Sequence, residues 1–223
     1  YETVGGLAPK GICGSGILDL IAEGFLSGWI DSAGNLQKSA SPCIRDVWDD
    51  TRQRNVPAII YAYDGNVPLY FTQDDIGEFL TCKAAAHTMV ATLLESVNVS
   101  PSEIGAFYLA GGFGTHYDLE SAITVGLYPD LPREKFKILG NSSLAGAKRL
   151  LLDTGCRARL DQIRALATYV QFGEMEKFVE NMQAARFLPH TDASRYPSVM
   201  RRLRERGKAY PPGKLAVERS GAD

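Results

Sequence analysis

The sequence has no long apolar run, since no stretch approaches 18 consecutive apolar residues. This length excludes a transmembrane helix, and we expect no membrane partner. Cysteine is also scarce, with four residues in 223 and no C-x-x-C pair. The spacing fits neither a zinc site nor an iron–sulfur cluster in this chain, so no metal site is predicted. We expect the four to be small buried residues in a reducing cytoplasm: Cys13, Cys43, Cys82 and Cys156.

An excess of either charge is absent as well. The 24 basic and 26 acidic residues give a formal charge of −2, which does not predict nucleic acid as a partner. Basic residues gather only near the end of the chain. We expect residues 193–223 to form a basic, poorly ordered tail; an interaction arm is the alternative. At the other end, Tyr1 follows neither an initiator Met nor a signal peptide, so we expect a cut point within a longer protein.

The composition is that of a globular domain, with 45% hydrophobic and 22% charged residues. Apolar residues at helical spacing predict a helix from Ile17 to Trp29. Two apolar stretches flank Asp64-Gly65-Asn66, which predicts a β-hairpin. Thr72 and Asp75 then resemble a capping box that begins a helix over 73–97.

Two polar residues, Lys83 and His87, lie on the apolar stripe of that predicted helix. A lysine that extends its amine to solvent and a packed histidine are the expected interpretation. A contact from Lys83 to an anionic ligand is the alternative.

The second half of the chain alternates between strand and helix patterns. A buried strand is predicted over 106–110, a helix capped by Asp118, another strand over 136–140 and a helix opened by Asn141. Two amphipathic helices, near 157–167 and 174–186, flank a candidate strand at 168–170. The alternation predicts the α/β fold class.

Glycines at the end of the strand over 106–110 are the most informative local feature. Gly111-Gly112-Phe113-Gly114 could let backbone amides approach a phosphate or nucleoside, but a left-handed turn without a ligand explains the same residues. Gly14-Ser15-Gly16 could expose amides at a helix N-terminus or merely allow close packing of that helix. Asn141-Ser142 is most simply a helix cap, with nucleotide contact as the alternative. No arrangement of side chains specifies a catalytic site.

Four motifs, in this order, resemble one known family. They are similar to the C-terminal part of the ATP-dependent reductive activators of corrinoid proteins, which belong to the superfamily of acetate and sugar kinases, heat-shock chaperones and actin. The motifs are Pro9–Leu20, Leu109–Gly114, Gly140–Ala147 and Phe187–Asp192. The resemblance covers residues 1–192 and implies the second lobe of an actin-like (ribonuclease H-like) ATPase fold.

The resemblance also implies a nucleotide site. The second motif matches the family's adenosine motif, and the helix from Asn141 to about Leu152 is similar to a connecting helix at the interface between lobes. The residues implied in cofactor binding are Gly14, Ser15, Gly16, Gly111, Gly112, Phe113, Gly114, Asn141 and Ser142. ATP or ADP with Mg²⁺ is the expected cofactor of the full-length protein. The family's phosphate motifs and its N-terminal [2Fe-2S] domain are absent from this chain.

The implied function is the coupling of ATP hydrolysis to reduction of an inactive Co(II) corrinoid to Co(I). The expected partner is the corrinoid protein of a methyltransferase system, and a homodimer is a second expected assembly. We expect the chain alone to be inactive. A docking or dimerisation module without enzymatic activity and a lobe of a small-molecule kinase are the alternatives.

Overall fold

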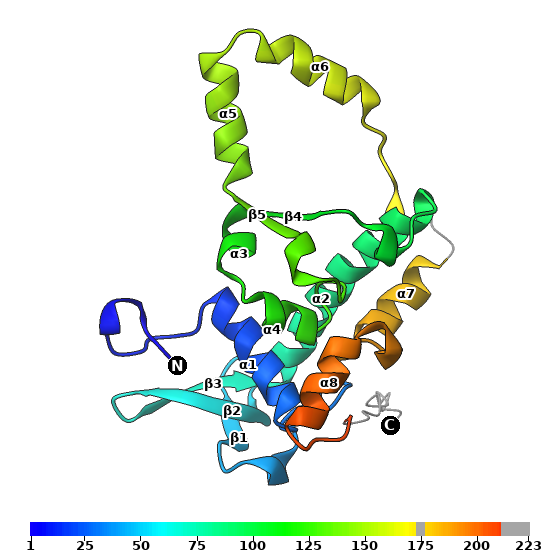
Figure 1. Cartoon of the computed structure of the whole chain (residues 1–223). Coiled ribbons are helices and arrows are strands. Elements are labelled where there is room, and N and C mark those ends of the chain that lie inside the picture. Colours follow the sequence, from blue (N-terminus) through cyan, green and yellow to red (C-terminus); the bar gives the residue numbers. More distant parts are fainter. Residues whose placement is uncertain (173–176, 211–223) are drawn as a thin grey trace, which may run out of the picture.

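The computed structural model describes residues 1–172 and 177–210, which form a mixed α/β structure with two separate sheets (Figure 1). The first sheet is antiparallel, in the order β1 (Ile44–Asp49), β2 (Arg54–Asp64) and β3 (Val67–Thr72). The second is a parallel pair, β4 (Phe107–Ala110) and β5 (Phe136–Gly140). The helices are α1 (Gly14–Leu26), α2 (Gln73–Ser96), α3 (Gly111–His116), α4 (Leu119–Thr124), α5 (Ser142–Leu152), α6 (Cys156–Leu166), α7 (Phe178–Ala185) and α8 (Pro197–Glu205). This confirms the α/β fold class.

The predicted hairpin is the β2–β3 pair. Asp64 pairs with Val67, and Gly65 adopts the positive φ of 59° that the two-residue turn requires. The predicted capping box is also present. Thr72 Oγ1 accepts the Asp75 N–H at 3.1 Å, and the Thr72 N–H donates to Asp75 Oδ2 at 2.9 Å. These bonds satisfy two amides at the start of α2, which runs from Gln73 to Ser96 as the sequence predicts.

One hydrophobic core joins α1, the antiparallel sheet and α2. Phe25 of α1, Ile59 of β2 and Ile76 of α2 are each fully buried in it. Burying side chains of this size contributes roughly 1.5–3 kcal/mol each. The core therefore fixes α2, to which the C-terminal part of the chain is attached.

Lys83 of α2 is only 2% exposed, so the expectation that its amine reaches solvent is wrong. Its Nζ donates to three backbone carbonyl oxygens, of Ala185 at 2.5 Å, Phe187 at 2.7 Å and Pro189 at 2.6 Å. Burial lowers the pKa of this amine. Because those carbonyls occupy its hydrogens, Lys83 anchors the segment after α7 to α2 instead of reaching an anion.

The basic C-terminal segment contains a docked helix, so the expectation of a poorly ordered tail is wrong for residues 193–210. Tyr196, Val199 and Leu203 are buried in the core. The excess of basic residues in this segment does not reveal the buried face of α8. Val199 and Leu203, four residues apart, lie on that face, while the arginines occupy the other sides of the helix. Residues 211–223 of the expected tail lie outside the described residues.

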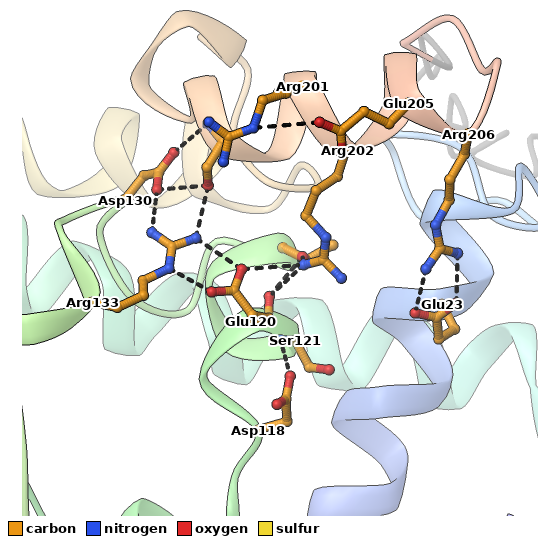
Figure 2. Close-up of polar contacts among 12 residues, drawn as sticks. Glu23, Asp118, Glu120, Ser121, Asp130, Arg133, Arg201, Arg202, Glu205 and Arg206 are labelled. Atoms are coloured by element: carbon orange, nitrogen blue, oxygen red, sulfur yellow. Dashed lines mark hydrogen bonds and ion pairs between the residues drawn. The ribbon is translucent and has the colours of Figure 1, made fainter.

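A polar network holds α8 in place (Figure 2). Asp130 accepts the Ser198 N–H and hydroxyl, both at 2.7 Å. Arg133 donates to Asp130 at 2.8 Å and, through Nε and a terminal nitrogen, to Glu120 at 2.5 and 2.8 Å. Arg202 donates to Thr124 Oγ1 at 2.7 Å. The bidentate pair with Glu120 fixes the guanidinium of Arg133, which also donates to the Ser198 hydroxyl of α8 at 2.9 Å.

We expect Ser198→Ala to lower the stability of the chain by about 1 kcal/mol, since the hydroxyl bonds Asp130 and Arg133. In a domain of this size the melting temperature should fall by about 2–4 °C, as measured by calorimetry. Ser143→Ala, at an exposed position of α5, is the matched control. Equal melting temperatures for both variants would contradict this role of the network.

Helices α5 and α6 form an arm, defined here as residues 141–166, that stands away from the rest of the chain (Figure 1). Both helices were predicted, as was α7 within its described part; residues 174–176 of that prediction lie outside the described residues. The candidate strand at 168–170 was wrong, because these residues form no strand. The buried strand over 106–110 was only half right: Leu109 is buried, but Tyr108 is 64% exposed.

Candidate functional site

The carboxyl ends of β4 and β5 bring two of the predicted motifs together. Ala110 pairs with Gly140 in the parallel register, so Gly111 and Asn141, which follow them, lie at the same edge of the sheet. Ligands of α/β proteins commonly bind at the carboxyl ends of parallel strands. This edge is the candidate site, and no single motif in the sequence reveals it.

Two of the glycines after β4 have structural explanations. Gly111 has a φ of 87°, a left-handed conformation that lets β4 lead directly into α3. A Cβ on Gly114 would lie 3.2 Å from the carbonyl carbon of Leu109, so glycine here allows α3 to pack closely on β4. Phe113 lies between them in α3.

Gly112 differs from both neighbours. It is exposed, its φ is not left-handed, and a Cβ there would meet no atom within 4 Å. Neither backbone strain nor packing against the described residues therefore requires glycine at this position. An approaching ligand would provide such a requirement, because a side chain would fill the space beside the α3 amides.

Asn141 caps α5, as the simpler interpretation predicted. Its Oδ1 accepts the Leu144 N–H at 2.9 Å. Gly140 before it has a φ of 66°, and Ser142 after it is the exposed first residue of the helix. A nucleotide contact by Asn141 or Ser142 stays a prediction.

Gly14, Ser15 and Gly16 form the first turn of α1, which contacts α3 (Figure 1). A Cβ on Gly16 would lie 2.9 Å from Ile12 Cγ1, so close packing accounts for this glycine. Ser15 Oγ lies 3.1 Å from Cys13 Sγ. The Ser15 hydroxyl, followed by the Gly16 amide, lowers the pKa of the Cys13 thiol.

The cysteines correct one expectation. All four are free, but Cys13, Cys43 and Cys82 are exposed and Cys156 is half-buried, so they are not the small buried residues that the sequence suggested. Within residues 1–172 and 177–210, no group of three or more His, Cys, Asp or Glu side chains could hold a metal ion. The same part of the chain has no helix that is both long and apolar enough to cross a membrane.

An open cleft of about 970 Å³ lies elsewhere, along α2. It is lined by side chains that include Gln73, Cys82 and Arg186, and by none of the nine predicted site residues. Its size alone does not make it a site, because its lining brings together no catalytic or ligand-specific set of groups.

A buried polar cluster was missed by sequence reasoning. The Nδ1 of His87 lies 3.1 Å from the Gly126 carbonyl oxygen, and the Tyr196 hydroxyl lies 3.3 Å from the same nitrogen. The His190 ring lies 5.3 Å from that of His87. Burial, followed by the charge of Lys83, lowers the pKa of His87 to about 3. Only the four-residue spacing of Lys83 and His87 was visible in the sequence, since their partners lie far along the chain.

Comparisons with known proteins identify the family of the chain. The profile of a family described as the C-terminal domain of RACo, the ASKHA domain, matches residues 1–200. The chain belongs to this family. Corrinoid activation enzyme RamQ of Eubacterium limosum is 30% identical to this chain over 186 residues, which cover 81% of this chain and 31% of RamQ.

A solved structure shows the same fold. A protein described as a reductive activator for a corrinoid, iron-sulfur protein matches with a TM-score of 0.80 and 35% identity, covering 89% of this chain and 32% of that one. The ASKHA domain described here thus spans about a third of the length of these two relatives.

Proposed function

We propose that this ASKHA domain is the second lobe of an actin-like ATPase and binds the adenosine part of ATP or ADP at the carboxyl ends of β4 and β5. The observation that carries the proposal is the pairing of Ala110 with Gly140, which brings the matched adenosine motif beside the matched Asn141-Ser142 motif. The open space at Gly112 fits a ligand that approaches the backbone. The first turn of α1, Gly14 to Gly16, would form the side of the site next to α3.

The nucleotide would act through lobe closure. Reduction of a Co(II) corrinoid to Co(I) is energetically uphill, so ATP binding or hydrolysis has to favour a complex in which the cobalt environment changes. In this proposal the domain contributes nucleotide binding, and the Mg²⁺ and phosphate contacts come from another part of the full-length protein. The corrinoid protein of a methyltransferase system is the proposed partner, in a reducing cytoplasm where the four free cysteines persist.

The described residues do not fit an iron–sulfur cluster, because they contain no group of ligands that could hold one. We therefore assign no electron-transfer step to this chain. A [2Fe-2S] cluster in the proposal belongs to another domain of the full-length protein.

We expect Gly112→Val in the full-length protein to weaken ADP and ATP binding at least tenfold, about 1.4 kcal/mol. The valine side chain would occupy the open space that the nucleoside needs, while the fold has room for it. Isothermal titration calorimetry with each nucleotide, with and without Mg²⁺, measures the change.

Gly105→Val is the matched control. Gly105 is also exposed, has no left-handed φ, and would place its Cβ in open space, but it precedes β4. Unchanged affinity in the Gly112 variant would remove this residue from the site. Equal losses in both variants would show a general effect of added bulk.

A further inference from the structure

In the proposed nucleotide site α1 lies beside α3, and α1 also packs against the next helix, α4. Ala22 of α1 and Ala122 of α4 are both buried in the core. α3 ends at His116 and α4 begins at Leu119, so α4 continues the chain of α3 after a short turn. A rotation of α1 against α4 would therefore move the first turn of α1 relative to the residues that follow β4.

Helix α8 is attached to both members of this α1–α4 contact (Figure 2). Arg206, directly after α8, donates to Glu23 of α1 through two terminal nitrogens, at 2.7 and 3.0 Å. Four residues earlier, Arg202 donates to Thr124 Oγ1 of α4 at 2.7 Å and lies 3.5 Å from Glu120 Oε2. Residues four apart lie on the same side of a helix. One side of α8 thus holds α1 with one arginine and α4 with the other.

The pair of Arg206 and Glu23 is better suited to positioning than to stability. The two side chains are 40% and 55% exposed, and ion pairs with this exposure contribute little to the free energy of folding. Their bidentate geometry nevertheless fixes the direction of both groups. The hydrogen bond from Arg206 also lowers the pKa of the Glu23 carboxyl group, so Glu23 stays ionised at neutral pH.

We propose that Arg206 and Glu23 are positioning residues for nucleotide binding, because their pair holds α1 at the distance from α3 and α4 at which the site accepts the nucleoside. This inference rests on the proposed function and goes beyond it, since Glu23 lies seven residues after Gly16, roughly 10 Å along the helix, and touches no part of the site. A site already held in its binding geometry loses less freedom when the ligand binds. By reciprocity, a bound nucleotide has to favour the docked position of α8 by the same factor.

The first test is the affinity of the full-length protein for ADP, measured by isothermal titration calorimetry. Arg206→Gln should raise the dissociation constant about threefold, the size expected from losing one half-exposed ion pair. Arg201→Gln is the matched control and should bind as the wild type does. It removes the same charge from α8, but Arg201 pairs with Glu205 of its own helix, at 3.7 Å.

A double-mutant cycle shows whether the two side chains act as one pair. Glu23→Gln should weaken ADP binding as much as Arg206→Gln does. E23Q/R206Q should bind no more weakly than either single variant, because all three proteins lack the same contact. Losses that add in the double variant, or an equal loss in Arg201→Gln, would overturn the positioning role.

The second test needs no nucleotide. Amide hydrogen exchange in α1 of the free protein should be faster in Arg206→Gln than in Arg201→Gln, because only the first variant releases α1 from α8. Added ADP should slow exchange in α8 of the wild type, and should do so less in Arg206→Gln. Unchanged exchange of α1 in Arg206→Gln would overturn the proposal.

The two tests separate this proposal from that of the nucleotide site. Weaker binding in Gly112→Val, with wild-type affinity in Arg206→Gln, would reject the positioning role alone. Weaker binding in Arg206→Gln, with wild-type affinity in Gly112→Val, would reject only the place of Gly112 in the site. Failure of the wild-type full-length protein to bind ADP would overturn both proposals.

Discussion

Replacing Lys83 with Met should lower the free energy of unfolding by about 3 kcal/mol or more, because three carbonyl oxygens lose their hydrogen-bond donor. Methionine has a similar length and fills the same space, but it donates no hydrogen bond. The carbonyl oxygens of Ala185, Phe187 and Pro189 would then lose the donor that now lies 2.5–2.7 Å from each. A buried acceptor without a partner costs about 1–3 kcal/mol, and three such groups are affected together.

Urea unfolding of wild-type and variant chains at one pH would measure this loss, because the midpoint falls with stability while the slope reports the surface exposed. Lys148→Met is the matched control, since Lys148 is exposed on the arm and should change stability by less than about 0.5 kcal/mol. A similarly small loss at Lys83 would show that other donors replace the amine. The expected large loss would establish that this side chain is a main attachment of the segment after α7 to α2.

The elements that the sequence predicted well are those whose stabilising contacts are local. The Thr72–Asp75 capping box, the Gly65 turn and the Asn141 cap each involve residues within three positions of one another. Apolar periodicity likewise identified α1 and α2, because a helix buries a face whose spacing is fixed by its own geometry. At the candidate site, the glycines after β4 were also recognised from local sequence, because they directly follow the strand pattern.

The parts that the sequence did not predict depend on distant partners. Lys83 binds carbonyls 102 to 106 positions away, and α8 docks on Asp130, 68 positions before Ser198. Neither separation leaves a periodic pattern. Similarly, the sequence placed the motifs at 111–114 and 141–142 in order, but the pairing of β4 with β5 was needed to bring them to one edge.

Acidification should destabilise the chain well before its carboxylates titrate. Burial lowers the pKa of His87 to about 3 and that of His190 to about 4, whereas an unfolded histidine has a pKa near 6.5. Between these values the unfolded state binds more protons than the folded state. The stability that the two neutral histidines contribute is therefore fully present above pH 6.5, and it is lost as the pH falls towards their folded pKa values.

The structure explains why these rings stay neutral. His87 lies between the Gly126 carbonyl and the Tyr196 hydroxyl, with no partner among the described residues for its Nε2. In His190, Nδ1 accepts the Asp192 N–H at 3.0 Å. Protonation of this nitrogen would break that hydrogen bond and bring its proton against the hydrogen of the Asp192 amide. The positive charges of Lys83 and Arg195 further disfavour protonation of both rings.

From pH 7.5 to 5.0 we expect a loss of about 4 kcal/mol, roughly 2 from each ring, because both folded pKa values lie below pH 5. Urea unfolding at both pH values measures it. The double variant H87Q/H190Q should lose most of this pH dependence whatever its absolute stability, whereas His116→Gln, at an exposed position of α3, should retain it. Equal pH dependence in the wild type and the double variant would assign the effect to other groups. Loss of the pH dependence in the double variant would show that the cluster joining α2 to the C-terminal segment requires neutral histidines. Docking of this segment would then contribute to the pH dependence of folding.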